Sequence, residues 1–264
     1  CQDAVAGRTV ILLFDTFEPR CSTTTIPRHA RSSGCAGRSG GRSAAAPEKL
    51  RPLKRQWRRD RPDMGTRSKR SERCRRCRMH VDLCICRLIP SYPLNTRLVL
   101  VMHHREQIKT TATGPLALEA LPNSELRIHG YQERPLDFSD LNSPQRRTLL
   151  LYPGDDVPVL SGTLLDRDKR PVTLVVPDGT WRQASRMGRR LPGLEHAEMV
   201  RLPMGPQSEW GIRREAHPHG LATFEAIARA LGIIESPAVQ RGMEELFRLM
   251  VKRTLHARDT TKNI

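Results

Sequence analysis

The amino-acid sequence predicts an α/β fold with a mostly parallel sheet, and three observations support that prediction. Short apolar runs rich in leucine and valine recur from residue 97 onward, as expected for buried strands. Segments with helical spacing lie between and after these runs, and strand–helix alternation favours a sheet flanked by helices. Four cysteines crowd together just before the first run, which predicts a small metal-bound module at the amino-terminal edge of the domain.

Five apolar runs are the expected strands. Buried parallel strands read as nearly continuous hydrophobic segments, so these runs fit a sheet that is covered on both faces. The three strongest are Leu98–Met102, Leu149–Tyr152 and Val172–Val176, and the two weaker ones are Leu126–Ile128 and Met199–Leu202.

The expected helices are Pro115–Leu121, Trp181–Leu191 and Thr223–Leu231, and Gly232 is expected to be the C-cap of the third. A final helix has six apolar residues at helical spacing, which we interpret as core packing and not as a site. These residues are Val239, Met243, Leu246, Phe247, Met250 and Val251.

The composition divides the chain into four parts. Residues 1–63 mix Gly, Ser, Ala, Pro and Arg without a sustained period, so we expect a disordered basic extension. Met64 stands shortly before the cysteines, which suggests that residues 1–63 are an upstream extension and not part of the native protein. We expect a zinc knuckle over 64–95, the main domain over 96–258 and a tail over 259–264.

The charge balance favours a polyanionic partner. Lys and Arg total 45 against 28 acidic residues, a formal net charge of +17. Residues 1–63 hold 13 basic and 6 acidic side chains, so the rest of the chain is basic as well. Charged residues also keep proteins soluble, and this alternative stays open. Because no run approaches the roughly 18 to 20 apolar residues that span a bilayer, we expect no membrane partner.

The cysteine segment has metal-ligand spacing. Cys74 and Cys77 are followed by Cys84 and Cys86, which supplies four thiols for a tetrahedral structural zinc ion. His80 lies between them as an alternative ligand, and two disulfides are the competing interpretation. The absence of a secretory signal favours zinc in a reducing cytoplasm. The arginines that surround the knuckle predict contacts with RNA phosphates; they are Arg73, Arg75, Arg76 and Arg78.

A second candidate site follows the run Val172–Val176. The next residues are Pro-Asp-Gly-Thr-Trp, so Asp178 is expected where a buried strand ends, the edge at which open α/β sheets bind ligands. The competing interpretation makes Asp178 a helix N-cap, with Gly179 permitting the turn.

The segment PDGTWRQASRM resembles the signature of the DTW-domain family. Three further blocks resemble the family in the same order, namely MHHREQIKTTATGPLALEALPNSELRIHG, LLLYPGDDVPVL and residues 217–235, so the resemblance spans roughly Cys74 to Arg258. The chain departs from it at His104, where members often have Pro, and at Ala222, where they often have Ser.

The resemblance implies a SPOUT-like knotted α/β catalytic domain. It also implies transfer of the 3-amino-3-carboxypropyl group of S-adenosylmethionine to N3 of a tRNA uridine. Asp178 is the first candidate for the base that removes the N3 proton, and Glu225 is the second. Glu225 has a structural alternative, since acids often complement a helix N-terminus.

Further residues are candidates for binding. Thr180, Trp181 and Thr223 are expected to bind the donor together with Asp178, although the threonines also suit helix caps and a lone Trp is usually core. Arg213 and Arg214 are expected to hold a phosphate or the donor carboxylate, with a solvated face as the alternative. His103 is a weaker candidate because a buried, hydrogen-bonded histidine is commoner. The competing functions are a SPOUT-type RNA methyltransferase and a non-catalytic zinc-dependent RNA-binding protein.

Overall fold

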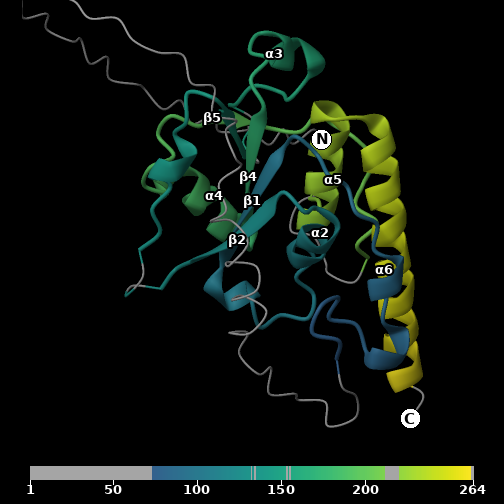
Figure 1. Ribbon diagram of the computed structural model, residues 1–264. Coiled ribbons are helices and arrows are strands. Elements are labelled where there is room, and N and C mark those ends of the chain that lie inside the picture. Colours follow the sequence, from purple (N-terminus) through teal and green to yellow (C-terminus); the bar gives the residue numbers. More distant parts are fainter. Residues whose placement is uncertain are drawn as a thin grey trace, which may run out of the picture. The chain divides into compact units, whose positions relative to one another are not determined.

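The computed structural model describes residues 73–131, 133, 135–152, 154, 156–211 and 220–262. In this part of the chain five parallel strands form one sheet in the order β2-β1-β4-β3-β5 (Figure 1). The strands are β1 (Arg97–His103), β2 (Ser124–His129), β3 (Arg147–Leu151), β4 (Val172–Asp178) and β5 (Glu198–Val200). The parallel α/β fold and all five expected strands are confirmed, and β4 extends two residues further, to Asp178. The strand order does not decide whether the chain is knotted, so the knot stays a prediction.

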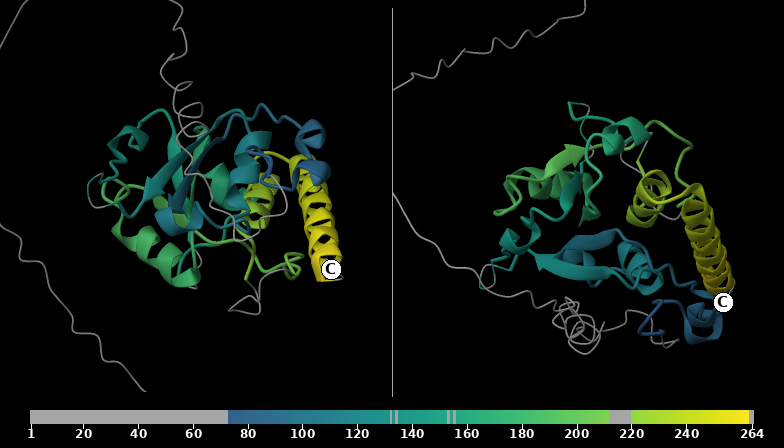
Figure 2. Two further views of the ribbon diagram at one scale, coloured as in Figure 1. Left: turned by 90° about the horizontal axis from the view of Figure 1, so that it is seen from below. Right: turned by 45° about the horizontal axis from the view of Figure 1, so that its top comes forward.

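The helices lie on both faces of the sheet. They are α2 (Gly114–Ala120), α3 (Gly162–Asp166), α4 (Trp181–Arg190), α5 (Thr223–Ile234) and α6 (Pro237–Lys262). Figure 2 shows α5 and α6 on one side of the strands and α4 on the other. Short 3₁₀ turns are η2 (Val81–Leu83), η3 (Cys86–Leu88), η4 (His104–Glu106) and η5 (Ser139–Leu141).

Alternating side chains of β1, β3, β4 and β5 contribute to two separate cores. On β1, Leu98 and Leu100 join the core beneath α2, α5 and α6, whereas Val99 and Val101 join the core beneath α4. Each such side chain is fully buried and stabilises the fold by about 1.5–3 kcal/mol. The sheet is therefore a rigid middle layer whose carboxyl edge is fixed from both sides.

The apolar stripe of α6 is buried, which confirms its interpretation as core. All six of its residues are at most 9% exposed, and Phe247 stacks on Phe224 of α5 with ring centroids 5.4 Å apart.

The prediction that Gly232 is a C-cap was wrong. Helix α5 continues through Gly232 to Ile234, and Glu235 is the C-cap. A Cβ at Gly232 would lie 2.8 Å from Cβ of Gln240 on α6. The glycine is therefore explained by the close approach of two helices and not by a helix end.

Within the described residues, no helix combines the length and apolar character needed to cross a membrane.

Candidate functional site

Asp178 ends β4 and points toward the start of α5. Its side chain is 4% exposed, and its Oδ1 accepts a hydrogen bond of 2.7 Å from the hydroxyl of Thr223, the first residue of α5. The amino terminus of a helix carries a partial positive charge, which favours a carboxylate at this position. The sequence prediction that Asp178 stands at the end of a buried strand is confirmed.

Two helix starts converge on this carboxylate. A Cβ at Gly114, the first residue of α2, would lie 2.8 Å from Oδ2 of Asp178. Thr113 Oγ1 accepts a hydrogen bond of 3.2 Å from the backbone N–H of Phe224, which ties α2 to α5. Glycine at position 114 therefore lets α2 begin against Asp178.

The alternative in which Asp178 caps α4 was wrong, because Thr180 is the N-cap. The Thr180 hydroxyl accepts from the backbone N–H of Gln183, and Oε1 of Gln183 accepts from the Thr180 N–H at 2.8 Å. Thr180 thus fills the capping role that the sequence left open, while Asp178 stays in the strand. Trp181 is the first residue of α4, and its side chain lies outside the described part of the structure.

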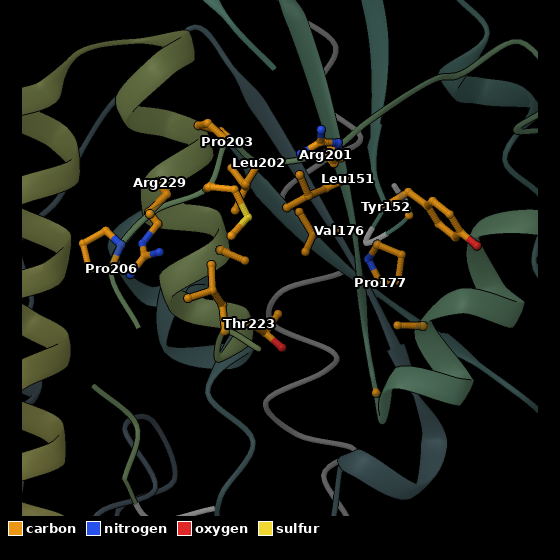
Figure 3. A pocket seen from close by; sticks show the side chains of 17 residues that line it. Leu151, Tyr152, Val176, Pro177, Arg201, Leu202, Pro203, Pro206, Thr223 and Arg229 are labelled. Atoms are coloured by element: carbon orange, nitrogen blue, oxygen red, sulfur yellow. The ribbon is translucent and has the colours of Figure 1, made fainter. Parts of the chain in front are cut away.

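A cavity of about 240 Å³ opens at the carboxyl ends of β3, β4 and β5 (Figure 3). Apolar side chains from the strand ends line its middle, and Thr223 of α5 lines its edge beside them. Pro177 and Gly179 line the cavity, but Asp178 does not. Asp178 is therefore linked to the cavity lining by its hydrogen bond with Thr223.

Two arginines that sequence reasoning missed also line this cavity. Arg201 follows β5, and Arg229 is the one cation of α5 (Figure 3). Among the described residues, no carboxylate forms an ion pair with either guanidinium, and Nε of Arg201 is buried without a hydrogen-bond partner. The signal available in the sequence was an arginine inside the otherwise apolar segment that follows Glu225.

Glu225 is buried and saturated by donors. Its carboxylate accepts the backbone N–H groups of Ala222 at 2.9 Å and Glu209 at 2.8 Å, and also the hydroxyl of Ser208. These contacts fix the segment that contains Trp210 against the first turn of α5. Glu225 is thus placed to order the loop, and it is not among the residues that line the cavity.

The four cysteines of the amino-terminal segment form one cluster. Their sulfur atoms all lie within 4.8 Å of one another, and all four are free thiols, so the disulfide alternative was wrong. The Sγ atoms are 3.4 Å apart for Cys74 and Cys86 and 3.7 Å for Cys77 and Cys84. Metal–sulfur bonds of about 2.3 Å in a tetrahedron put sulfurs about 3.8 Å apart, so the cluster fits a metal ion.

His80 lies outside this cluster. Its Nε2 is 3.1 Å from a guanidinium nitrogen of Arg73, and the four thiols form the metal-binding group without it. Burial raises the pKa of Cys74, but backbone N–H groups of Cys77 and Arg76 donate to its sulfur and bring the pKa down to about 7. A thiol with a lowered pKa is readily deprotonated when a metal cation binds to its sulfur.

The arginines of the knuckle differ in their contacts. Arg73 donates to the backbone oxygen of Arg78, and Arg78 is buried and donates to the backbone oxygens of Gln107 and Lys109. Arg76 forms an ion pair of 2.9 Å with Glu119 on α2, and its side chain is 45% exposed. Arg75 is exposed. Arg213 and Arg214 lie outside the described residues.

The knuckle is also attached to α6. A guanidinium nitrogen of Arg253 donates to the backbone oxygens of Leu83 at 3.0 Å and Cys84 at 2.7 Å. Figure 1 shows the knuckle segment beside the lower end of α6.

Comparisons with known proteins define the class of this protein. The family model described as "DTW domain" matches residues 71–255, and the chain therefore belongs to the DTW-domain family. Among the family's curated members it is similar to tRNA-uridine aminocarboxypropyltransferase 2 of Macaca fascicularis, with 31% identity over 58% of this chain and 53% of that protein. The protein of the same name from Drosophila melanogaster is 32% identical over 59% and 64%.

Two further similarities are more distant. The tRNA-uridine aminocarboxypropyltransferase A of Arabidopsis thaliana is 25% identical over 64% of this chain and 76% of that protein. The solved structure of the SAM-dependent rRNA:acp-transferase Tsr3 from Vulcanisaeta distributa aligns with a TM-score of 0.39 and 15% identity over 63% and 81%. The chain spans about half the length of the first curated relatives that it matches.

Proposed function

We propose that this protein is a tRNA-uridine aminocarboxypropyltransferase that uses S-adenosylmethionine. The observation that supports it most is the family match over residues 71–255, whose signature Asp178-Gly-Thr-Trp181 stands at the carboxyl edge of the sheet beside a cavity. Curated relatives named for this activity agree with the proposal. The substrate is tRNA, and the reducing cytoplasm in which four free thiols persist is the proposed location.

The donor supplies an activated carbon next to its sulfonium. In the reaction, uridine N3 forms a bond to the terminal carbon of the aminocarboxypropyl group, the carbon–sulfur bond breaks, and the electron pair returns to sulfur as a neutral thioether. The N3 proton must leave at the same time. The protein therefore has to position both partners and accept one proton.

Asp178 is the proposed proton acceptor, acting through Thr223. Because the hydroxyl of Thr223 donates to Oδ1 and also lines the cavity, it can pass the proton from the uridine to the carboxylate. The partial positive charge at the amino terminus of α5 favours the carboxylate form. Glu225 holds the loop at Glu209 in place and is not needed for the proton transfer.

The cavity is the proposed donor site. Apolar lining from Leu151 and Val176 suits the adenosine part of the donor. The side chain of Trp181 is proposed to contribute a flat face. Arg201 and Arg229 would hold the donor carboxylate by charge-assisted hydrogen bonds, which favours delivery of the group that carries this carboxylate.

The cysteine cluster is proposed to hold a structural zinc ion. Four thiolates close the tetrahedron, so no coordination position remains for a catalytic water. Zinc would order the knuckle so that exposed Arg75 and half-exposed Arg76 contact RNA phosphates. Further proposed RNA contacts are Arg73, Arg213 and Arg214.

Two radiolabelled donors test the function. Donor labelled in its carboxyl carbon transfers label to tRNA only if the aminocarboxypropyl group moves, and donor labelled in its methyl group transfers label only if methyl moves. We expect carboxyl label alone, with a matching nucleoside mass. Methyl label alone would establish the methyltransferase alternative, and no transfer from either donor, despite RNA binding, would establish the binding-protein alternative.

A further inference from the structure

Three histidines and a tyrosine gather at the carboxyl ends of β1 and β2, and we call them the imidazole cluster. His103 and His104 stack with ring centroids 4.4 Å apart and planes inclined by 30°. His129 lies edge-on to His103 at 6.3 Å, and Tyr131 lies 5.2 Å from His104. His103 was only a weak candidate from the sequence, and neither the proposed proton transfer nor the cavity involves these rings.

The cluster lies on the same edge of the sheet as Asp178. His103 and His129 are paired across β1 and β2, and the preceding residue of β1, Met102, is paired with Asp178 on β4. The donor cavity occupies the ends of β3, β4 and β5. Asp178 therefore stands between the donor cavity and the imidazole cluster, as the reacting centre of a two-substrate enzyme would.

Packing fixes the orientation of the His104 ring. Gly130 has φ +101°, and a Cβ there would lie 3.2 Å from Cε1 of His104, so glycine permits both the turn and the close approach of the ring. Among the described residues, Nδ1 of His104 is buried without a hydrogen-bond partner. The orientation of His104 therefore depends on its neighbours' rings and on Gly130.

The surroundings of two of the imidazoles favour the neutral form. Nδ1 of His103 accepts a hydrogen bond of 3.2 Å from the backbone N–H of Arg105, which puts its proton on Nε2. Burial, followed by the charges of neighbouring histidines, lowers the pKa of His103 and of His129. Neutral rings can lie together without repulsion and can stack on an uncharged base.

The surface around the rings suits RNA. Tyr131 is 48% exposed, Ile108 is 61% exposed, and Arg105 is exposed beside them. Proteins that bind unpaired nucleotides combine aromatic faces, which stack on bases, with cations that follow the backbone. The net charge of +17 makes a polyanion the fitting partner.

We propose that the imidazole cluster is a stacking platform for an unpaired nucleotide of the RNA substrate, next to the reacting uridine. Exposed Tyr131 and partly exposed His104 supply the stacking face, the rings of His103 and His129 pack against it, and Arg105 contacts a phosphate. The identity of the RNA as tRNA rests on the proposed function, but the platform itself does not.

Fluorescence anisotropy with an unmodified tRNA transcript and with a labelled oligouridylate tests the platform at several salt concentrations. We expect Tyr131→Ala and His104→Ala each to weaken binding about tenfold, with an unchanged slope of affinity against salt. Arg105→Gln is expected to lower that slope by about one. Tyr131→Phe, which keeps the ring, and Leu255→Ala, which removes an apolar side chain 41% exposed on α6, are the matched controls.

The outcomes separate the platform from the proposed function. Wild-type affinity in both Tyr131→Ala and His104→Ala, or no RNA binding by the wild-type protein, would overturn the platform. Titration calorimetry with S-adenosylmethionine should show unchanged donor binding in the platform variants, and a parallel loss of donor binding and thermal stability would mean a structural role instead. If the wild-type protein transfers no carboxyl label while the two variants still weaken RNA binding, the platform stands and the proposed function fails.

Discussion

The cysteine knuckle and the sheet edge at Asp178 are two sites built in different ways. The knuckle brings its four ligands from thirteen consecutive positions, and much of the segment is only half-buried. The sheet edge brings Asp178 and Thr223 together across 45 positions, and fully buried strands support them from both faces. We therefore expect order at the knuckle to depend on a bound ion, whereas order at the sheet edge depends on the packed core.

The largest difference between these two regions is expected when the proposed zinc ion is lost from the knuckle. Structural zinc in small modules contributes about 10–16 kcal/mol of binding free energy, so losing one thiolate ligand in Cys77→Ser should abolish stoichiometric zinc. Hydrogen exchange should accelerate over residues 74–88 while the strands stay protected, and zinc content is measured by atomic absorption. His80→Gln is the control and should keep one zinc per chain. Equal loss of protection in the strands would show that the two regions are one cooperative unit.

The next largest effect is expected at the sheet edge itself. Asp178→Asn keeps the shape but removes the proton acceptor, so the rate of aminocarboxypropyl transfer should fall roughly 10²–10⁴-fold. RNA affinity and zinc content should not change. Asp166→Asn changes an exposed aspartate of α3 and should retain full activity. Unchanged turnover in Asp178→Asn would remove the acceptor role of this residue.

A smaller effect is expected at the two cavity arginines. A hydrogen bond to a charged group contributes about 1.5–3 kcal/mol, so Arg201→Gln and Arg229→Gln should each weaken donor binding about 10- to 100-fold. Calorimetry with S-adenosylmethionine and with its decarboxylated analogue completes the test as a double-mutant cycle. The wild-type protein should bind the analogue more weakly than S-adenosylmethionine. The variants should bind the two compounds with similar affinity. Equal discrimination in wild type and variants would exclude these arginines as the carboxylate site.

The smallest effect tests the packed core that supports the sheet edge. Gly232→Ala places a methyl group against Gln240, and overpacking of this kind should lower the free energy of unfolding by about 1–3 kcal/mol. Urea unfolding measures the loss, while zinc content should not change. Gly162→Ala is the matched control because a Cβ at Gly162 meets nothing within 4 Å. Wild-type stability in Gly232→Ala would mean that α5 and α6 can move apart without cost.

The two regions also differ in how much of each could be predicted from the sequence. The cysteine cluster could be predicted because its spacing alone brings the thiols within reach of one ion, and the disulfide alternative was excluded only by the positions of the sulfurs. The strand end at Asp178 was predictable from the apolar run before it. Its contact with Thr223 was not predictable, whereas the cap role of Thr180 was one of two alternatives that the sequence left open.

The residues that sequence reasoning missed share one property. Arg201, Arg229 and the rings of the imidazole cluster other than His103 carry at most a weak local signal, because a single arginine or histidine occurs in many solvated or buried settings. Gly232 is the opposite case. A local sequence rule predicted a helix cap there, whereas the structure shows that its small size permits the close approach of α6.

By itself, the sequence determined the parallel α/β fold, the buried stripe of the last helix, the thiol cluster and the family signature at Asp178. The first three follow from periodicity or spacing within a short segment, and the signature follows from the resemblance of one short segment to a known family. Only the tertiary structure decided that Asp178 is linked to the cavity lining through Thr223, that two arginines lie there and that four rings gather on the neighbouring strands. The physical reason is that parallel strands bring together ends that are distant in the chain, and which side chains meet there depends on strand order and helix packing.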